Sequence, residues 1–408
     1  MANVSSSIGI SKYPKLRFPG FDDPWERTPF SNLYRYVSEK NDGSFSVEQI
    51  ISVANMYFKA DARITDKDYL RTYNVFKFGD IAFEGNKNKN FAYGRFVENT
   101  IGDGIVSHVF VVFRPVNESH NLEYWKYAIN NENVMGRILA RCTKKTTMMT
   151  NLVASDFLAQ TIYCPSLDEQ AHIATFLSLI DERIRKQEEL IEAIGKYRRG
   201  LLRTIFLEKP ALLPIETADN LKIEEVCDVL SGKRIPKGET FSSQPTEYRY
   251  ITVSDMGEKY VRSDTLQYIT SHTEKQISRY KVKDGDIIIS VAGTLGKLNI
   301  ITSDLEGVNL TENCDRFTNF RRINPEYLYY VLSSDLIQVQ IKASKTKNGQ
   351  PKLALERIRN FTIPVPERST QEKLVCVMNA IDRQIAFHKA INEKYYAMRA
   401  GLLQQLFI

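Results

Sequence analysis

The strongest constraint in this 408-residue sequence is an internal repeat. Residues 162–207 and 363–408 align without a gap at a constant offset of 201 residues, so that Gln170 corresponds to Gln371 and Phe206 to Phe407. About 12 of the 46 aligned positions are identical. Self-similarity at a fixed offset indicates a duplicated structural unit. We therefore expect a tandem repeat with pseudo-twofold symmetry and not two unrelated domains.

Both copies carry apolar residues at alternating steps of three and four positions. The first copy has Ile173, Leu177, Ile180, Ile184, Ile191, Ile194 and Leu201, and the second has Leu374, Met378, Ile381, Ile385, Tyr395, Leu402 and Leu406. A strict 3.5-residue period is typical of a coiled-coil seam. The pattern predicts two long antiparallel helices that bury these stripes against each other. We assign these seam residues to a helical spacer between the two domains.

Polar residues interrupt the seam at matching positions. Gln187 corresponds to His388, and Arg198 corresponds to Arg399. A polar seam residue can fix the register of a coiled coil at a cost in stability. Alternatively, these side chains lie at the edge of the stripe and are solvated, and the sequence leaves both interpretations open.

The starts of the two helices are marked by prolines. Pro165 and Pro366 directly precede the repeated helical stretches. Serine and aspartate favour the N-cap position because their side chains accept hydrogen bonds from the first turn. We expect Ser166 or Asp168 to cap the first helix and Ser369 to cap the second.

The segments between the helices read as mixed strand and helix, with short β-rich runs at 109–113, 250–253 and 286–291 separated by turn signals. The predicted fold class is α+β: two globular α/β domains separated by the two coiled-coil helices. The expected boundaries are an N-terminal segment at 1–25, a first domain at 26–165, a first helix at 166–209, a second domain at 210–366 and a second helix at 367–408.

Composition restricts the class of protein. Hydrophobic residues make up 43% and charged residues 25% of the chain, which is typical of globular proteins. No apolar stretch approaches the roughly 18 residues that a membrane-spanning helix needs, and the first residues lack the apolar centre of a signal peptide. The five scattered cysteines form no C-x-x-C pair. These features favour a cytoplasmic protein without a membrane partner.

The net charge of +6 permits a nucleic-acid partner, and basic stretches with few acids recur at corresponding places in the two domains. For each stretch alone the competing interpretation is a solvated lysine-rich loop, but the recurrence favours DNA. The candidate DNA-binding residues are Lys87, Lys89, Arg95, Lys144, Lys145, Lys233, Arg234, Lys237, Thr294, Lys297, Lys345, Lys347, Asn348, Gln350 and Lys352. Lysine and threonine contact phosphates, whereas asparagine and glutamine pair with adenine edges.

Motifs of catalysis are incomplete. The tetrapeptide at 324–327, N-P-E-Y, differs from the N-P-P-Y of adenine methyltransferases at its third residue, and Gly293-Thr294-Leu295-Gly296-Lys297 is too short for a phosphate-binding loop. We find no metal-ligand cluster and no catalytic constellation, so the chain is expected to be non-catalytic and to hold no cofactor. The alternatives are a self-sufficient DNA methyltransferase or nuclease, and a coiled-coil scaffold with no DNA role.

The ordered motifs resemble one known family. The opening P-K-L-R-F-P-G-F at 14–21 with Trp25, the L-D-E-Q and S-T-Q-E starts of the repeated helices, the G-L-L near their ends, and the segments 232–238, 285–289 and 292–296 are similar to the specificity subunits of type I restriction–modification systems.

The resemblance implies two target-recognition domains, each of which reads one half of a bipartite site in double-stranded DNA. It also implies paired helices that dock two methyltransferase (modification) subunits, which bind S-adenosylmethionine, and ATP-dependent restriction subunits. It does not imply which bases are read.

Overall fold

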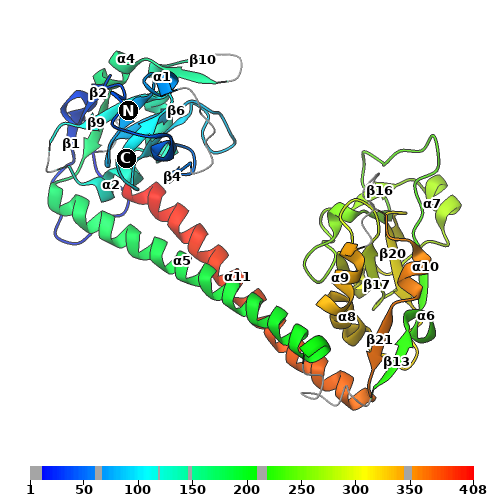
Figure 1. Ribbon diagram of the computed structural model, residues 1–408. Coiled ribbons are helices and arrows are strands. Elements are labelled where there is room, and N and C mark those ends of the chain that lie inside the picture. Colours follow the sequence, from blue (N-terminus) through cyan, green and yellow to red (C-terminus); the bar gives the residue numbers. More distant parts are fainter. Residues whose placement is uncertain (1–11, 60–66, 118–119, 146–148, 209–217, 344–351) are drawn as a thin grey trace, which may run out of the picture. The chain divides into compact units, whose positions relative to one another are not determined.

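The computed structural model describes residues 12–59, 67–117, 120–145, 149–208, 218–343 and 352–408 (Figure 1). The chain divides into two compact units, one of Met1–Glu188 with Ile391–Ile408 and the other of Glu189–Ala390. Each unit holds a strand-rich module together with part of each long helix. We use "first module" for β1 to β12 and "second module" for β13 to β21.

The first module mixes short strands with short helices. Its strands are β1 (Glu26–Pro29), β2 (Tyr34–Val37), β3 (Ile51–Ser52), β4 (Tyr57–Phe58), β5 (Asn74–Phe76), β6 (Ile81–Glu84), β7 (Arg95–Glu98), β8 (Gly104–Val106), β9 (Val111–Pro115), β10 (Thr143–Lys145), β11 (Thr150–Leu152) and β12 (Thr161–Cys164). Its helices are α1 (Lys67–Leu70), α2 (Leu122–Ala128), α3 (Glu132–Cys142) and α4 (Ala154–Ala159).

The centre of the first module is an antiparallel sheet in the order β2-β9-β6-β7. Strand β1 pairs separately with β12, and the other pairs are β3-β4, β5-β8 and β10-β11. Phe157 on α4 lies 4.4–4.9 Å, between ring centroids, from Phe30, Phe96 and Phe113. These rings are fully buried, so the module has an aromatic core of its own.

The second module has the same kinds of element. Its strands are β13 (Asp219–Lys222), β14 (Asp228–Ser231), β15 (Tyr248–Ile251), β16 (Gln267–Ile269), β17 (Ile287–Ser290), β18 (Leu298–Ile300), β19 (Asn309–Leu310), β20 (Cys314–Thr318) and β21 (Thr362–Val365). Its helices are α6 (Ile223–Val226), α7 (Ser271–Ile277), α8 (Pro325–Ser333), α9 (Asp335–Ala343) and α10 (Leu355–Arg359).

The two modules share one strand order. The central sheet of the second module runs β14-β20-β17-β18, all antiparallel, and β13 pairs with β21 as β1 pairs with β12. Helices α2, α3 and α4 follow β9, and α8, α9 and α10 follow β20 at the same points of the topology. The sequence repeat therefore continues as a structural repeat through segments where the sequences have diverged. The predicted α+β fold class, with two α/β modules and two long helices, is confirmed.

The long helices are α5 (Leu167–Arg203), followed by a wider helical turn at Thr204–Glu208, and α11 (Arg368–Leu406). The Ser166 hydroxyl accepts a hydrogen bond from the Glu169 amide, as an N-cap does. The prediction for Ser369 is wrong, because α11 starts one residue earlier and the Glu367 carbonyl already accepts bonds from the first turn.

The two helices pair in opposite directions within each unit. In the first unit, Ile173 and Leu177 of α5 share a core with Leu406 and Phe407, at the end of the chain. In the second unit, the last turns of the first helix share a core with the first turns of α11, including Leu374. All the predicted seam residues are buried or partly buried. The antiparallel pairing that the heptad pattern predicts is therefore present in both units.

Ion pairs cross between the helices at the polar seam positions. In the first unit, Arg399 Nε donates to Asp181 Oδ1 at 2.5 Å, and in the second unit Arg198 Nε donates to Asp382 Oδ1 at 2.6 Å. Both arginines are only partly exposed, so the solvated-edge interpretation is wrong for them. Because the two pairs are related by the 201-residue offset, each unit uses the same contact to fix the register of its helices.

We predict that Leu177→Ala lowers the free energy of unfolding by about 2–5 kcal/mol, because Leu177 is fully buried between helix and module. Leu179→Ala is the matched control, since Leu179 lies on the same helix but is 58% exposed, and it is expected to change stability by under about 0.5 kcal/mol. Urea denaturation of both variants measures the difference. Equal losses would contradict the pairing of the helices through this seam.

Candidate nucleic-acid interface

Loops that are distant in sequence meet where the strands β14, β17 and β20 of the second module end or begin, at one end of its central sheet. The Gly232 amide donates to the Cys314 carbonyl at 3.0 Å, and the Val291 amide donates to the Asn313 carbonyl at 2.8 Å. A bridge joins Ala292 to Lys352. These contacts bring together the loop 232–241, the turn 291–297, the segment 311–313 and Lys352, which we call the loop cluster.

Glycines permit this close approach. A Cβ atom on Gly232 would lie 2.0 Å from the Thr311 carbonyl oxygen, so any side chain there would separate the loop from the neighbouring strand. Gly293 has a φ of +72°, a conformation that residues with a Cβ rarely adopt. The G-K and A-G-T-L-G motifs thus have a structural basis in the geometry of the loop cluster.

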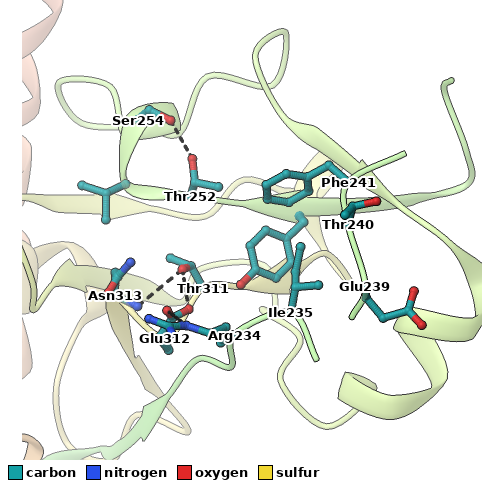
Figure 2. A pocket seen from close by; sticks show the side chains of 12 residues that line it. Arg234, Ile235, Glu239, Thr240, Phe241, Thr252, Ser254, Thr311, Glu312 and Asn313 are labelled. Carbon is teal, nitrogen blue, oxygen red and sulfur yellow. Dashed lines mark hydrogen bonds and ion pairs between the residues drawn. The ribbon is translucent and has the colours of Figure 1, made fainter. Parts of the chain in front are cut away.

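An open pocket of about 630 Å³ is lined by residues of the loop 232–241 and of the segments 250–254 and 311–313 (Figure 2). Arg234 and Glu312 face each other on its rim, with Nε donating to Oε1 at 2.6 Å. The phenyl ring of Phe241 and the ring of Tyr250, whose centroids are 5.6 Å apart, also line the pocket. The hydroxyl groups of Thr252 and Ser254, the amide of Asn313 and the carboxylate of Glu239 also line the pocket. The pocket therefore combines flat aromatic surface with polar groups of low net charge.

The ion pair changes the acidity of both partners. The hydrogen bond from Arg234 to Glu312 is the main reason that the pKa of Arg234 is raised. Burial alone would raise the pKa of Glu312, but the hydrogen bond from Arg234 opposes it, and that pKa lies below its usual range. Both groups are thus held in their charged forms at neutral pH.

The residues of the second module that were predicted to bind DNA differ in the solvent exposure of their side chains. Lys233, Lys237, Thr294 and Lys352 are exposed on the loop cluster, as is Arg234. The ammonium group of Lys297 is partly buried and donates to the Met256 carbonyl. Lys345, Lys347, Asn348 and Gln350 lie outside the described residues.

The first module has the corresponding loop after β6. A bridge joins Asn86 to Met149, at the place where Ala292 meets Lys352 in the second module. Lys87 and Lys89 are exposed on this loop, and Lys144 is exposed on β10.

Two further predicted residues belong to the same module. Lys145 lies on β10, and Arg95 is engaged within the module. Arg95 Nε donates to Glu84 at 2.8 Å, and its Nη2 donates to the Ala54 carbonyl at 2.9 Å.

The neutral and acidic residues that line the pocket are absent from the sequence-based prediction. Thr252, Ser254, Glu312 and Asn313 line the pocket, and Phe241 supplies its aromatic surface. None of these residues is basic, so a pattern of lysines and arginines does not indicate them. A signal for Glu312 and Asn313 is their place immediately before β20, since the ends of central strands carry the loops that form binding sites.

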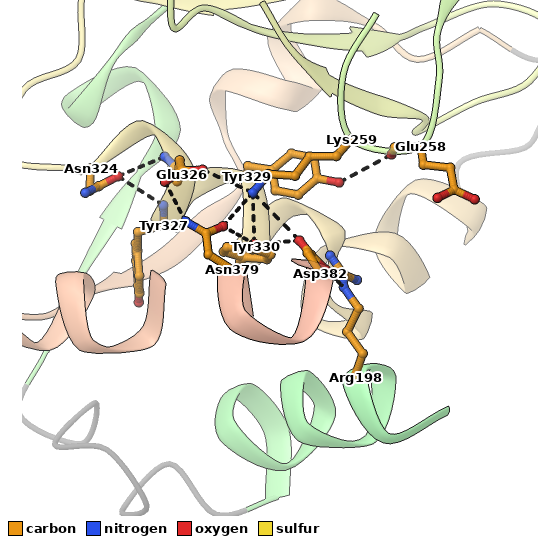
Figure 3. Close-up of polar contacts among 10 residues, drawn as sticks. All are labelled: Arg198, Glu258, Lys259, Asn324, Glu326, Tyr327, Tyr329, Tyr330, Asn379 and Asp382. Carbon is orange, nitrogen blue, oxygen red and sulfur yellow. Dashed lines mark hydrogen bonds and ion pairs between the residues drawn. The ribbon is translucent and has the colours of Figure 1, made fainter. Parts of the chain in front are cut away.

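Elsewhere in the second module, Lys259 joins the module to the helices (Figure 3). Its ammonium group donates to Glu326 Oε1 at 3.1 Å and Tyr330 OH at 3.0 Å on α8, and to Asn379 Oδ1 at 2.6 Å on α11. It also lies 3.7 Å from Asp382 Oδ2. The side chain is 13% exposed, so a partly buried cation joins its own loop to α8 and α11.

The tyrosine–aspartate contact is repeated in the first unit. Tyr330 OH donates to Asp382 at 2.6 Å, and Tyr127 OH donates to Asp181 at 2.8 Å. Burial, and then the hydrogen bond to the aspartate, raise the pKa of each tyrosine far enough to keep it protonated. In both units a helix of the module therefore contacts the same aspartate that pairs with an arginine of the opposite long helix.

Two negative findings apply to the described ranges. They contain no group of three or more histidine, cysteine, aspartate or glutamate residues arranged to hold a metal ion. Neither the long helices nor any other helix within these ranges has an apolar stretch sufficient to cross a bilayer.

Comparisons with known proteins agree on one family. Residues 215–394 match the type I restriction modification DNA specificity domain. The chain is 22% identical over 257 residues to the type I restriction enzyme MjaVIII specificity subunit of Methanocaldococcus jannaschii. The aligned region covers 59% of this chain and 60% of that protein. It is 24% identical over 233 residues to the EcoBI specificity subunit of Escherichia coli, covering 52% and 49%. The matches thus span about half to three fifths of the curated relatives.

Two solved structures have the same fold. One is a chain from a study of complex assembly and conformational transition in a type I R-M system, with a TM-score of 0.62 and 17% identity over 95% of this chain and 98% of that one. The other is the S subunit of a type I restriction–modification system from M. genitalium, with a TM-score of 0.53 and 18% identity over 97% and 99%.

The repeated modules and the duplicated helices form a fold that the chain shares with these two solved structures. The chain is thus similar to the specificity subunits of type I restriction–modification systems.

We predict that Lys259→Ala lowers the free energy of unfolding by about 1–3 kcal/mol, because Glu326 and Asp382 lose a charged hydrogen-bonding partner in a partly buried site. Lys275→Ala is the control, since Lys275 is an exposed lysine of the same module. Guanidinium denaturation of both variants measures the effect. A loss of unfolding free energy no greater than that of Lys275→Ala would show that Lys259 does not stabilise the contact between its loop, α8 and α11.

Proposed function

We propose that this chain is the DNA sequence-specificity subunit of a type I restriction–modification complex and is itself non-catalytic. The observation that carries the proposal is the duplicated architecture: two modules with one strand order but different loops, each held on a helix pair that is itself a sequence repeat. Two different readers on an equivalent framework suit a bipartite DNA target with unlike half-sites.

The DNA surface that we propose is the loop cluster of the second module and the loop after β6 with β10 in the first. Its exposed basic residues, such as Lys87, Lys144, Lys237 and Lys352, would contact phosphates and position each module. Neutral residues between them, such as Asn313, are available for base edges. The predicted boundaries of the target-recognition domains, 26–165 and 210–366, remain part of this proposal.

The partners that we propose are two modification subunits, which bind S-adenosylmethionine, and ATP-dependent restriction subunits. The seam residues are buried or partly buried in the helix pair, so we assign them to the spacer. The outer faces of the long helices carry exposed apolar side chains, among them Leu179, Tyr197 and Phe387, which suit docking of another subunit. A complex that acts on chromosomal DNA would work in the cytoplasm.

The helices also suit a spacer. At about 1.5 Å per residue, the 37 residues of α5 extend about 55 Å, which exceeds the roughly 34–36 Å of one DNA turn. We propose that the length of α5 and α11 sets the number of unspecified base pairs between the half-sites.

We predict that one heptad inserted after Glu188 and another after Lys389, which are equivalent positions in the repeat, lengthens the spacer by roughly three base pairs. The reason is that seven helical residues add about 10.5 Å and a base pair rises about 3.4 Å. Mapping of methylated adenines in a host that expresses the chain with its modification subunit gives the spacer length.

A heptad inserted into α5 alone is the control, since it puts the two stripes out of register and is expected to abolish methylation. An unchanged spacer in the double insertion would refute the spacer role. Methylation or cleavage by the purified chain alone would support the enzyme alternative, and failure of the complex to select any DNA sequence would support the scaffold alternative.

We predict that the triple variant Lys233→Ala, Lys237→Ala, Lys352→Ala weakens DNA binding by the complex and makes it less dependent on salt. The slope of log K against log salt should fall in magnitude by about 0.9 for each phosphate that the variant no longer neutralises. Lys222→Ala removes an exposed lysine on β13, away from the loop cluster, and should leave the slope unchanged. Titrations at several salt concentrations measure it, and an unaltered slope in the triple variant would place these lysines outside the DNA surface.

A further inference from the structure

The loop cluster contains one charged pair whose geometry is more specific than phosphate binding requires. Arg234 and Glu312 are 78 residues apart in sequence and pair at 2.6 Å on the rim of the pocket (Figure 2). The arginine side chain is 79% exposed and the glutamate side chain is 27% exposed. The pair is thus open to a ligand on the arginine side.

Both partners stand on fixed backbone. The amide next to Arg234, that of Lys233, donates to the Leu310 carbonyl at 2.8 Å, and the Tyr250 hydroxyl donates to the Lys233 carbonyl at 2.7 Å. On the other side, the Thr311 hydroxyl donates to Glu312 Oε2 at 3.0 Å, and the Thr311 amide is bonded to the Ile251 carbonyl. The loop and the glutamate therefore hold the guanidinium in one orientation.

The hydrogen bond to Glu312 uses the Nε edge of the guanidinium. Within the described residues, neither Nη1 nor Nη2 of Arg234 donates a hydrogen bond. These two groups present parallel donors, which match the N7 and O6 acceptors of guanine in the major groove. A glutamate carboxylate accepts from the N4 amino group of cytosine. Side by side, the two residues are complementary to the major-groove edge of one G·C base pair.

The charge of the site favours a base over a phosphate. A carboxylate 2.6 Å from the arginine cancels its charge and repels a phosphate oxygen. Of the other polar side chains that line the pocket, Thr252, Ser254 and Asn313 are neutral and Glu239 is acidic, so none of them attracts a phosphate by charge. An exposed ion pair of this kind contributes little to stability, so stability alone gives no strong reason for it.

We propose that Arg234 and Glu312 read one G·C base pair in the half-site bound by the second module. Arg234 donates to guanine, and Glu312 both orients Arg234 and accepts from the paired cytosine. The inference rests on the proposed function, because it needs the second module to face DNA.

The test compares Arg234→Ala with the unaltered chain, each assembled with the modification subunit, on a library of duplexes randomised over the target site. The preference for G·C is expected to fall on the order of 10- to 100-fold at a single position in one half-site, with the other positions unchanged. Arg234→Lys keeps the positive charge without the two parallel donors, so it should lose the same preference while the salt dependence of binding stays unaltered.

Glu312→Gln tests the second role. It retains an oxygen acceptor but loses the charge that holds Arg234, so a smaller loss of preference is expected at the same position. Arg322→Ala is the matched control, because Arg322 forms an equally short pair with Asp219 on β13, outside the loop cluster, and it should change no position.

Three outcomes decide the matter. Loss of preference at one G·C position in Arg234→Ala supports the inference. A uniform loss of affinity over all sequences, or no change at any position, overturns it and leaves the proposed function intact. An unaltered complex that selects no bipartite sequence overturns the proposed function as well.

Discussion

The burial of one apolar stripe against another, along α5 and α11, is the interaction on which each unit depends. Strand β12 leads into α5 and β21 leads into α11 within a few residues, so each module is continuous with a helix. The first turns of these helices, with Ile173 and Leu374, belong to the cores of the modules themselves. Separating the helices would therefore open the modules as well as the seam.

Polar contacts fix the rotation of α5 and α11 about their axes within this apolar packing. Hydrophobic stripes tolerate sliding and turning, whereas the bonds of Asp181 and Asp382 are directional. Each aspartate bonds to an arginine on the opposite helix and to a tyrosine of the module. A residue of one helix thus orients both the other helix and the module. Lys259 adds a contact of this kind in the second unit, from a loop of the module itself.

The structure separates a repeated framework from divergent surfaces. Strand order, helix order and the aspartate contacts are the same in both units, whereas the loops at the sheet edge differ in length and chemistry. The first module presents Lys87 and Lys89 with Asn88 between them, and the second presents an arginine–glutamate pair beside aromatic rings. Under the proposed function, a change of DNA target would require changes in loops only, without loss of the packing that supports them.

The sequence alone determined the features that repeat at short range. A 3.5-residue period is a property of neighbouring positions, and the constant offset of 201 residues follows from comparing the sequence with itself, so the sequence suffices to assign Leu177 and Met378 to a seam. Contacts between distant segments were decided only by the tertiary structure. Arg95 and Lys297, assigned to DNA by their charge, are engaged with groups that no local pattern brings near. Glu312 meets Arg234 only because two strands of one sheet end side by side, and such a meeting depends on the whole fold.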